Sequence, residues 1–380
     1  MLSRKRQLAG KIESEEGVAE TLAAADAKLL VYDQKISFDP QLFVRNPLRS
    51  SMSKVGKITG KRPGGIDFRY TLHGSGSITV EPEWSKYIKG CGSGVSELYA
   101  ITIGAVASGP FQHGEVITGG TSSATGRVIK NTANGTTTFY FVSLTGTFES
   151  GEVITGGTSG ATATTGSVPS QAGFAVEPLS ASVPSLTVGG YEDGIRKLLK
   201  GSRGSCKMLF RNGEPVMAEN SFMGVEAGVT DTALLSSISY ETTKPPVFMN
   251  ATITCDGVSL KISELDIDLA AVLAAREDVG DVRGILSYMI TDRDPAGSFN
   301  PEMLAVATHD FHTKWFENTE MELNVPWGSV AGNKFEFYAP KAVYNKIDDE
   351  EREGIQSARC TFDLNAALAL GDTEWALLIL

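Results

Sequence analysis

The sequence predicts a mainly β protein, and three observations lead to this fold class. Glycine is frequent, at 41 of 380 residues, and a chain rich in Gly, Ser and Thr is typical of many turns and strands. Polar and apolar residues alternate in several short segments, most regularly over residues 66–72. The nine-residue string Gly-Glu-Val-Ile-Thr-Gly-Gly-Thr-Ser occurs at 114–122 and again at 151–159, which indicates a small repeated β unit inside a larger chain.

The composition is compatible with a folded core and with synthesis in a reducing compartment. Hydrophobic residues make up 41% of the chain and charged residues 21%, which is typical of globular proteins. No run of about eighteen apolar residues occurs, so we expect no membrane span, and the basic amino terminus lacks the apolar stretch of a secretory signal. The four cysteines are far apart, so we expect buried, reduced thiols and neither a zinc site nor disulfides.

The net charge of −11 is distributed unevenly along the chain. Residues 1–90 carry 15 Lys and Arg against 10 Asp and Glu, whereas residues 250–380 carry 10 against 23. A basic part and an acidic part of one chain could attract each other between copies. The alternative is that both parts are solvated surfaces, and the sequence leaves both readings open.

The first part of the chain reads as an arm followed by a β unit. Residues 1–28 are polar and rich in Ala, which favours an amino-terminal arm or a short helix, and residues 29–38 read as a strand. A long polar loop follows, and compact domains rarely keep such loops without a use. A strand over 66–72 and a short helix beginning near Pro82 come next. The basic residues of the loop are Arg45, Arg49, Lys54, Lys57, Lys61 and Arg62.

Residues 101–169, which contain the repeat, are predicted to be an inserted all-β module. Turn signals separate short strands in this segment, and the two copies of the repeat are expected to form equivalent hairpins of one small barrel or sandwich. The larger pattern resumes at 170–250, so residues 29–100 and 170–250 together make the first unit. Few aromatic residues occur in the repeats, but binding of carbohydrate or of a partner by the insert stays open.

The second unit, at 251–380, contains a row of carboxylates. Over residues 260–269 the apolar residues share one face of the expected strand. Three carboxylates on the other face are costly to bury unpaired, so they must face water, a cationic partner or a wet channel. A strand at 285–291 and a helix from Pro301 to about Glu317 follow. The three carboxylates are those of Glu264, Asp266 and Asp268.

No arrangement of residues indicates catalysis or a cofactor. The sequence lacks a nucleotide-binding glycine motif, a nucleophile elbow and the H-E-x-x-H zinc motif. His309 and His312 lie three apart on the expected helix, but a zinc site needs a third ligand. We therefore expect a protein that is not an enzyme and binds no metal or cofactor.

Several short strings occur in order along the flanking regions, each weak alone. They begin at Ala19, Arg45, Gly60, Glu83, Tyr191, Ala275, Thr291 and Thr308 and read AETL with ADA, RNPLR, GKR, EW through KGCG, YEDG, AREDV, TDRDP and THDF. In the order of these strings, the flanking regions resemble the tail tube, or major tail, proteins of long-tailed bacteriophages of the non-contractile, siphovirus-like type. The resemblance covers about 1–100 and 175–380, and the insert at about 101–170 departs from the shorter members of that family.

The resemblance implies a β-sandwich or barrel-like tube fold with a flanking helix. Copies would join their sheets into rings, and rings would stack into a hollow tube in the virion tail that conducts DNA without binding it specifically. Assembly would occur in the host cytoplasm, with the tape measure, tail terminator and distal tail proteins as further partners. The carboxylate row (264, 266 and 268) becomes a candidate for the wall of the bore, and the basic loop (45–62) a candidate for contact with the next ring.

The order of elements also hints at an internal duplication. A strand, a loop that begins with Arg, a strand and a Pro-Glu helix start occur from residue 29 and again from residue 260. On this basis we favour two tube-like units per chain and a ring of three chains with pseudo-sixfold symmetry over a ring of six. The alternative function is a receptor- or glycan-binding tail or baseplate component that uses the insert, and a third is a polysaccharide-degrading tail enzyme.

Overall fold

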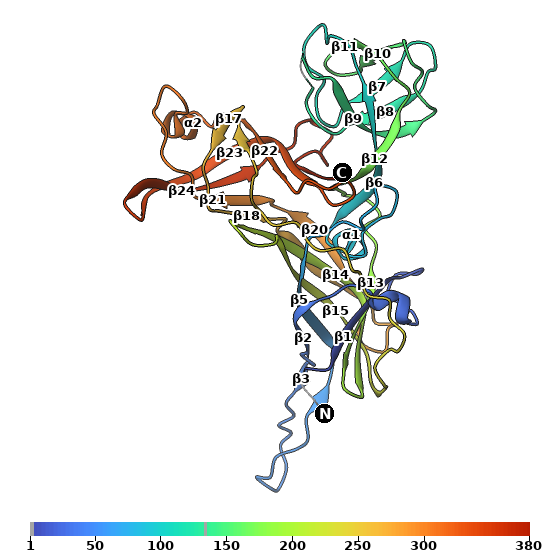
Figure 1. Ribbon diagram of the computed structural model, residues 1–380. Coiled ribbons are helices and arrows are strands. Elements are labelled where there is room, and N and C mark those ends of the chain that lie inside the picture. The colour runs from blue at the N-terminus through green and yellow to red at the C-terminus, as the bar shows by residue number, and fades with distance from the viewer. Residues whose placement is uncertain (1–3, 133–134) are drawn as a thin grey trace.

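The computed structural model of this protein describes residues 4–132 and 135–380, and it confirms the mainly β fold class (Figure 1). Long antiparallel strands form the body, and the two α-helices of the described residues have six residues each. All four cysteines are buried and free, as expected from their spacing. Within the described part of the chain, no helix is long and apolar enough to cross a membrane.

The elements are named in chain order, with the 3₁₀ helix called η1. They are β1 (Arg6–Ile12), η1 (Ala24–Ala27), β2 (Tyr32–Phe38), β3 (Leu42–Phe43), β4 (Ile58–Thr59), β5 (Pro63–Thr71), α1 (Ser85–Gly90), β6 (Ser93–Thr102), β7 (Val116–Gly119), β8 (Thr125–Val128), β9 (Thr138–Thr145), β10 (Val153–Gly156), β11 (Thr162–Thr164), β12 (Ser170–Pro178), β13 (Leu186–Glu192), β14 (Ile195–Arg211), β15 (Met217–Asp231), β16 (Ile253–Cys255), β17 (Val258–Leu260), β18 (Glu264–Asp268), β19 (Ala271–Glu277), β20 (Ile285–Arg293), β21 (Ala296–Phe299), α2 (Phe311–Phe316), β22 (Met321–Trp327), β23 (Phe335–Arg352), β24 (Ile355–Leu364) and β25 (Ala376–Ile379).

Eight of these strands form one continuous antiparallel sheet through the body. Their hydrogen-bonded order is β2-β5-β15-β14-β18-β21-β24-β23. The first four strands come from residues 32–231 and the last four from residues 264–364. The halves join where β14 pairs with β18, from Lys207 opposite Asp268 to Arg211 opposite Glu264.

The two halves of this sheet repeat the same arrangement. In the first half, β2 and β5 are separated by the β3–β4 hairpin, and the β14–β15 hairpin returns so that β15 pairs with β5. In the second half, β18 and β21 are separated by the β19–β20 hairpin, and the β23–β24 hairpin returns so that β24 pairs with β21. Each half also has its short α-helix between these two parts of the chain.

One face of the sheet is apolar and forms the main core. In the first half, the Phe68 ring is stacked with Phe222 at 5.8 Å between centroids and meets the Tyr87 ring of α1 edge-on at 5.0 Å. In the second half, Phe299 packs against Phe362 at 5.1 Å. These side chains are almost fully buried, and burying one aromatic side chain contributes about 1.5–3 kcal/mol. The core explains why alternate residues of the central strands are apolar.

Two expected elements differ from the structure. Residues 6–12 of the expected amino-terminal arm form β1 and pair with β13, so this part of the segment belongs to the body, and residues 1–3 lie outside the described residues. The prediction of a helix from Pro301 to about Glu317 is wrong in its start and length, because the helix that forms is α2, Phe311–Phe316. Asp310 accepts a hydrogen bond from the Thr313 backbone N–H at 2.9 Å and caps it.

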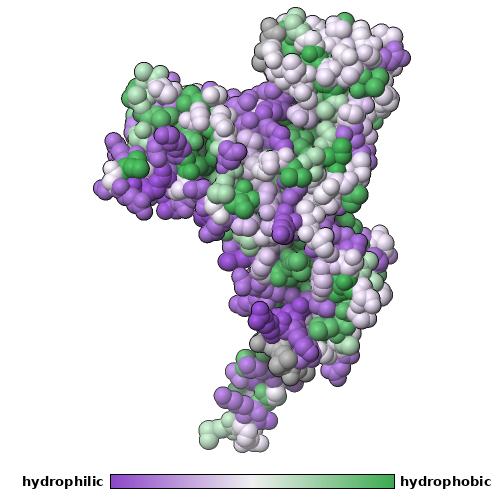
Figure 2. All heavy atoms as spheres, viewed as in Figure 1, coloured by the Kyte–Doolittle hydropathy of each residue, from purple (hydrophilic) through white to green (hydrophobic). Residues whose placement is uncertain are grey.

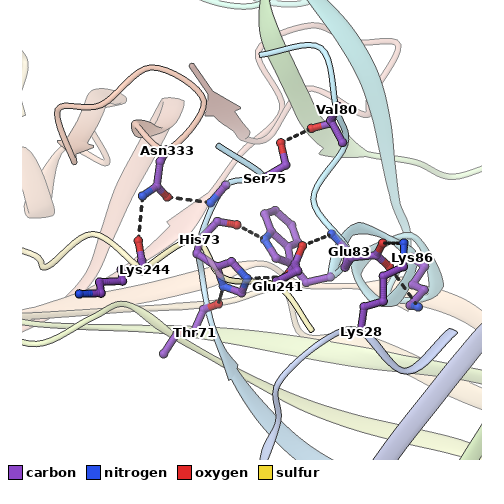
Figure 3. Close-up of polar contacts among 12 residues, drawn as sticks. Lys28, Thr71, His73, Ser75, Val80, Glu83, Lys86, Glu241, Lys244 and Asn333 are labelled. Carbon is purple, nitrogen blue, oxygen red and sulfur yellow. Dashed lines mark hydrogen bonds and ion pairs between the residues drawn. The ribbon is translucent and has the colours of Figure 1, made fainter. Parts of the chain in front are cut away.

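Residues 232–252, between the two halves, are irregular and are tied down by a polar network (Figure 3). Glu241 pairs with the His73 imidazole and accepts from the Glu83 backbone N–H at 3.1 Å. Asn333, from the second half, accepts from the Gly74 N–H at 2.8 Å and donates to the Lys244 carbonyl at 2.9 Å. The network therefore fixes this segment to both halves of the sheet. We call this network of hydrogen bonds the joint.

Candidate assembly surfaces

The eight-stranded sheet has an open edge at each end. In the described residues, β2 pairs with β5 alone, and Arg6 donates to the Gln34 carbonyl at 3.2 Å on the other side. At the far end, β22 and β25 pair with β23 no further than Ala342, and residues beyond Lys346 pair with β24 alone. Unpaired backbone groups of this kind can accept a strand from another chain.

The two open edges differ in charge. The β23 edge, residues 346–351, carries four consecutive acidic residues, and of these Asp348 alone has an ion pair within the described chain, with Lys346 at 2.6 Å. The β2 edge carries Lys35, which has no ion pair among the described residues and lies opposite Asp67, and Asp33, which pairs with Arg69 at 3.5 Å. Figure 2 shows that the end of the body containing β23 and β24 is strongly hydrophilic. The β23 edge is thus acidic, whereas the β2 edge carries one charge of each sign.

The carboxylate row lies on the polar, half-exposed face of the sheet, opposite the core. As the alternation predicts, Leu265 and Ile267 point into the core while the carboxylates point outward. The row is not free, however: Asp266 pairs with Arg211 at 2.5 Å and with Lys207 at 3.4 Å, and Glu264 lies 3.7 Å from Arg211. Asp268 accepts from the Ala270 backbone N–H at 2.8 Å. Cations of β14 therefore balance most of this row.

The basic loop forms an arm that projects from the body, and we call residues 39–62 the arm (Figure 1). Its only regular part is the β3–β4 hairpin, and Leu48 and Met52 at its tip are fully exposed. Figure 2 shows hydrophobic and hydrophilic residues next to each other along the arm. An exposed apolar tip with basic neighbours is typical of a contact element that is completed by another molecule.

The six basic residues of the loop fall into two groups. Lys61 and Arg62, at the root of the arm, pair within the chain, with Glu277 and with Glu226 at 3.4 Å. The others have no acidic partner among the described residues, although Arg49 at the tip donates to the Ser53 and Lys54 carbonyls. The members of this second group are Arg45, Arg49, Lys54 and Lys57, and these are the residues that remain available to a partner.

The insert has a core of its own, built on aromatic and small apolar residues such as Phe111, Phe139 and Phe141. The two repeats form equivalent hairpins, β7–β8 and β10–β11, as the sequence predicts. The strands β7 and β10 also pair with each other, and the pairing is symmetric about Thr118 opposite Thr155. The two repeats are therefore related by a local twofold axis.

Each repeat is closed by the glutamate of the other repeat. Glu115 accepts from the Ser159 backbone N–H at 2.9 Å and its hydroxyl at 2.8 Å, and Glu152 accepts from the corresponding groups of Ser122 at 3.0 and 2.9 Å. Both glutamates are buried. A Cβ at Gly119 would lie 2.6 Å from a Glu152 carboxylate oxygen, so glycine is required there. We call this exchange the reciprocal clasp.

Polar contacts hold the insert against the second half of the body. Arg127 pairs with Glu177, and Lys130 pairs with Glu336 at 2.5 Å. The side-chain amide of Asn131 donates to Glu322 at 3.2 Å, and the Tyr338 hydroxyl donates to the same carboxylate at 3.0 Å. The sequence indicated an insert but none of its contacts with the body, because those of Arg127, Lys130 and Asn131 join residues about 50 to 200 positions apart.

His113 lies buried at this junction. Its Nδ1–H donates to the Ile129 carbonyl at 2.6 Å, its ring meets that of Tyr338 edge-on, and its Nε2 has no partner. Burial lowers the pKa of His113 to about 4, opposed by the Ile129 carbonyl and assisted by the charge of Arg127. The neutral imidazole is thus the form that fits this site.

We expect His113 to make the insert junction sensitive to acid. Its folded pKa lies below the ordinary value of 6.5, so the unfolded chain binds more protons, and stability is lost as the pH falls from about 6.5 towards about 4. The full effect is about 3 kcal/mol. Calorimetric melting of the parent and of His113→Asn at pH 7 and pH 4.5 measures it. The variant should lose part of this pH dependence, and an unchanged dependence would contradict the assignment.

Comparison of the chain with protein-family models and with curated protein sequences found no match. In the described residues, no group of three or more His, Cys, Asp or Glu side chains is arranged to hold a metal ion. The features available for a functional argument are therefore the two open edges, the polar face, the arm and the insert.

Proposed function

We propose that this protein is a structural virion protein that polymerises as stacked rings into a bacteriophage tail tube, through which DNA passes during ejection. The observation that carries the proposal is the repeated four-strand order, β2-β5-β15-β14 and β18-β21-β24-β23, with a free edge at β2 and another at the part of β23 beyond Lys346. The resemblance of the flanking strings to tail tube proteins, stated above from sequence, points in the same direction.

The internal junction supplies a template for the junction between copies. Inside the chain, the last strand of one half, β14, pairs with the first strand of the next, β18. The same step taken between molecules pairs β23 of one copy with β2 of another and leaves no open edge when the ring closes. The charges differ between the two junctions: β14 is basic and β18 acidic, whereas β23 is acidic and β2 carries both Lys35 and Asp33.

The repeated four-strand order of the two halves also supports a ring of three chains. If each four-stranded half counts as one unit, three chains supply six similar units and the pseudo-sixfold symmetry expected from sequence. A ring of six chains remains the alternative, and it would place twelve halves around the bore. The mass of an isolated ring separates the two arrangements directly.

The polar face of the sheet is suited to the wall of a DNA channel. A wall with free Lys and Arg would bind phosphates by counterion release and would hold DNA back. On this face Lys207 and Arg211 are paired with the carboxylates of β18, and Arg69 is paired with Glu219 at 2.8 Å. Most of the cations are thus neutralised, and DNA would meet a hydrophilic surface with little attraction for it.

Negative-stain microscopy of the purified protein at increasing concentration tests the proposal. We expect rings and then hollow tubes, with a ring mass of three chains, about 120 kDa from the 40.4 kDa chain. A protein that stays monomeric at every concentration would overturn the proposed function. Rings of six chains would keep the tube but overturn the three-chain arrangement.

A further inference from the structure

The hairpin of the second half folds back over the first half of the same chain. Ile285 and Tyr288 of β20 pack against the buried Val225 of β15. Ion pairs secure both sides, Lys200 with Asp281 at 2.7 Å and Arg283 with Glu226 at 2.8 Å. The segment between β18 and β21 therefore covers part of the polar face of the sheet, around Val225 of the β14–β15 hairpin, on the other side of the internal junction.

The surface that it covers has an uncovered counterpart in the second half. In the first half, Pro63, which begins β5, lies opposite Val225, and Val225 lies opposite Lys200. In the second half, Ala296, which begins β21, lies opposite Asp363, and Asp363 lies opposite Val343. Val225 is fully buried beneath β20, whereas Val343 and Asp363 are half-exposed.

The arm, in turn, is a hairpin without a surface to cover. It lies between β2 and β5 as the β19–β20 hairpin lies between β18 and β21, but among the described residues β2 is the end of the sheet and no other half lies beside it. The arm therefore projects freely, with its apolar residues exposed or half-exposed.

The apolar residues of the two hairpins occupy matching positions. Phe43 follows the end of β2 by five residues, as Leu273 follows the end of β18. Met52 and Val55 precede Pro63 by 11 and 8 residues, as Ile285 and Tyr288 precede Ala296. In the second hairpin all three of these positions lie in the cluster around Val225. The arm thus has apolar residues at the same three positions, but in the arm they do not pack on a surface of the chain.

We propose that the arm of one copy docks on the Val343–Asp363 surface of the neighbouring copy within the same ring, an inference that rests on the proposed tube function. Phe43, Met52 and Val55 would cover Val343, and the unpaired cations of the arm would face Asp363, whose hydrogen-bond partner in the chain is the neutral Asn345 amide. The basic loop is then a contact inside each ring, in place of the contact between stacked rings expected from sequence.

Cross-linking in single rings and in stacked tubes tests the docking. The double variant Met52→Cys with Val343→Cys is oxidised, and rings and tubes are separated by sedimentation before denaturing electrophoresis. The four native cysteines are buried, so the introduced thiols dominate the reaction. The matched control is Met52→Cys with Val153→Cys, since Val153 is exposed on the insert. We expect cross-linked multimers in isolated rings for the first pair and none for the control.

The other outcomes are decisive as well. Cross-links that form in stacked tubes but not in single rings would overturn the inference in favour of contact between rings, and so would assemblies that form without any cross-link. A chain that forms no rings by microscopy, with or without the cysteines, would instead remove the proposed function itself. As a second measurement, Met52→Ser with Val55→Ser should raise the concentration needed for rings at least tenfold and leave the monomer's melting temperature unchanged.

Discussion

A single proline on the open edge of β23 is expected to abolish ring formation without unfolding the chain. Of two consecutive residues in a strand, one N–H points to the paired neighbour and the other to the open side. Asp349→Pro and Glu350→Pro therefore form a matched pair, because both positions are exposed and pair with β24 alone. The variant that loses the outward N–H removes a hydrogen bond from each proposed junction between copies. Its pyrrolidine side chain also occupies the space that β2 of the next copy would enter.

The expected size of this effect follows from the groups left unpaired. A buried carbonyl without its donor costs about 2 kcal/mol, or roughly thirtyfold in affinity, at each junction, and the loss recurs at every junction of the ring. Analytical ultracentrifugation measures the assembly, and thermal melting of the monomer measures folding. One variant should melt like the parent and stay monomeric, whereas the other should lower the stability of the β23–β24 hairpin. Normal ring formation by both would refute edge pairing at β23.

Removal of the reciprocal clasp is expected to unfold the insert while the body remains folded. In Glu115→Ala, the Ser159 hydroxyl and the partly buried backbone N–H groups of Gln112, Thr158 and Ser159 lose their acceptor. Each unpaired donor costs about 1–3 kcal/mol, so we expect a loss of about 4 kcal/mol. The loss is confined to the insert because this module has a separate core.

Hydrogen exchange measured by mass spectrometry can compare the stability of the insert with that of the body in each variant. Residues 103–165 should exchange rapidly in Glu115→Ala and faster still when Glu152→Ala is added, while β14 and β15 keep their protection. Glu149→Ala is the matched control, since this glutamate lies in the same module with an exposed side chain. Unchanged exchange in the double variant would show that the clasp is not needed for folding of the insert.

The strands were predictable from sequence because their pattern is local. Residues 66–72 alternate between core and surface as expected, and all of them except Leu72 lie within β5. The outward position of Asp266 follows from the same period of two. The partners of Asp266 were not predictable, because Lys207 and Arg211 lie on a strand whose pairing with β18 is set by the tertiary fold. Sequence therefore indicated an acidic row but not the cations that balance it.

The expected helix at Pro301 failed for a specific reason. Asn300, directly before Pro301, is a residue type that favours the cap of a helix, but its side-chain oxygen accepts from the Ser263 and Glu264 backbone N–H groups at 2.9 and 3.0 Å. Its amide also donates to the Ser263 hydroxyl at 2.7 Å. The Asn300 side chain therefore holds β18 in place and does not cap a helix. The helix begins later in the chain, where the Asp310 side chain accepts from the Thr313 backbone N–H.

The clasp was only partly predictable from the repeat. Two identical strings with Glu at the second position and Ser at the ninth predicted equivalent hairpins, and the structure confirms them. Each glutamate accepts hydrogen bonds from the other repeat because β7 pairs antiparallel with β10. The linear sequence does not specify this pairing.

The joint connects the two halves in addition to the β14–β18 pairing, and His73 lies within it (Figure 3). Burial disfavours the charged imidazole, but the hydrogen bond and charge of Glu241 and the Thr71 carbonyl outweigh this and raise the pKa of His73. In a closed circle the turns between successive units must sum to a full rotation, so a deviation of a few degrees at the joint would recur in every chain. In the proposed tube, the diameter would then depend on the hydrogen bonds of the joint.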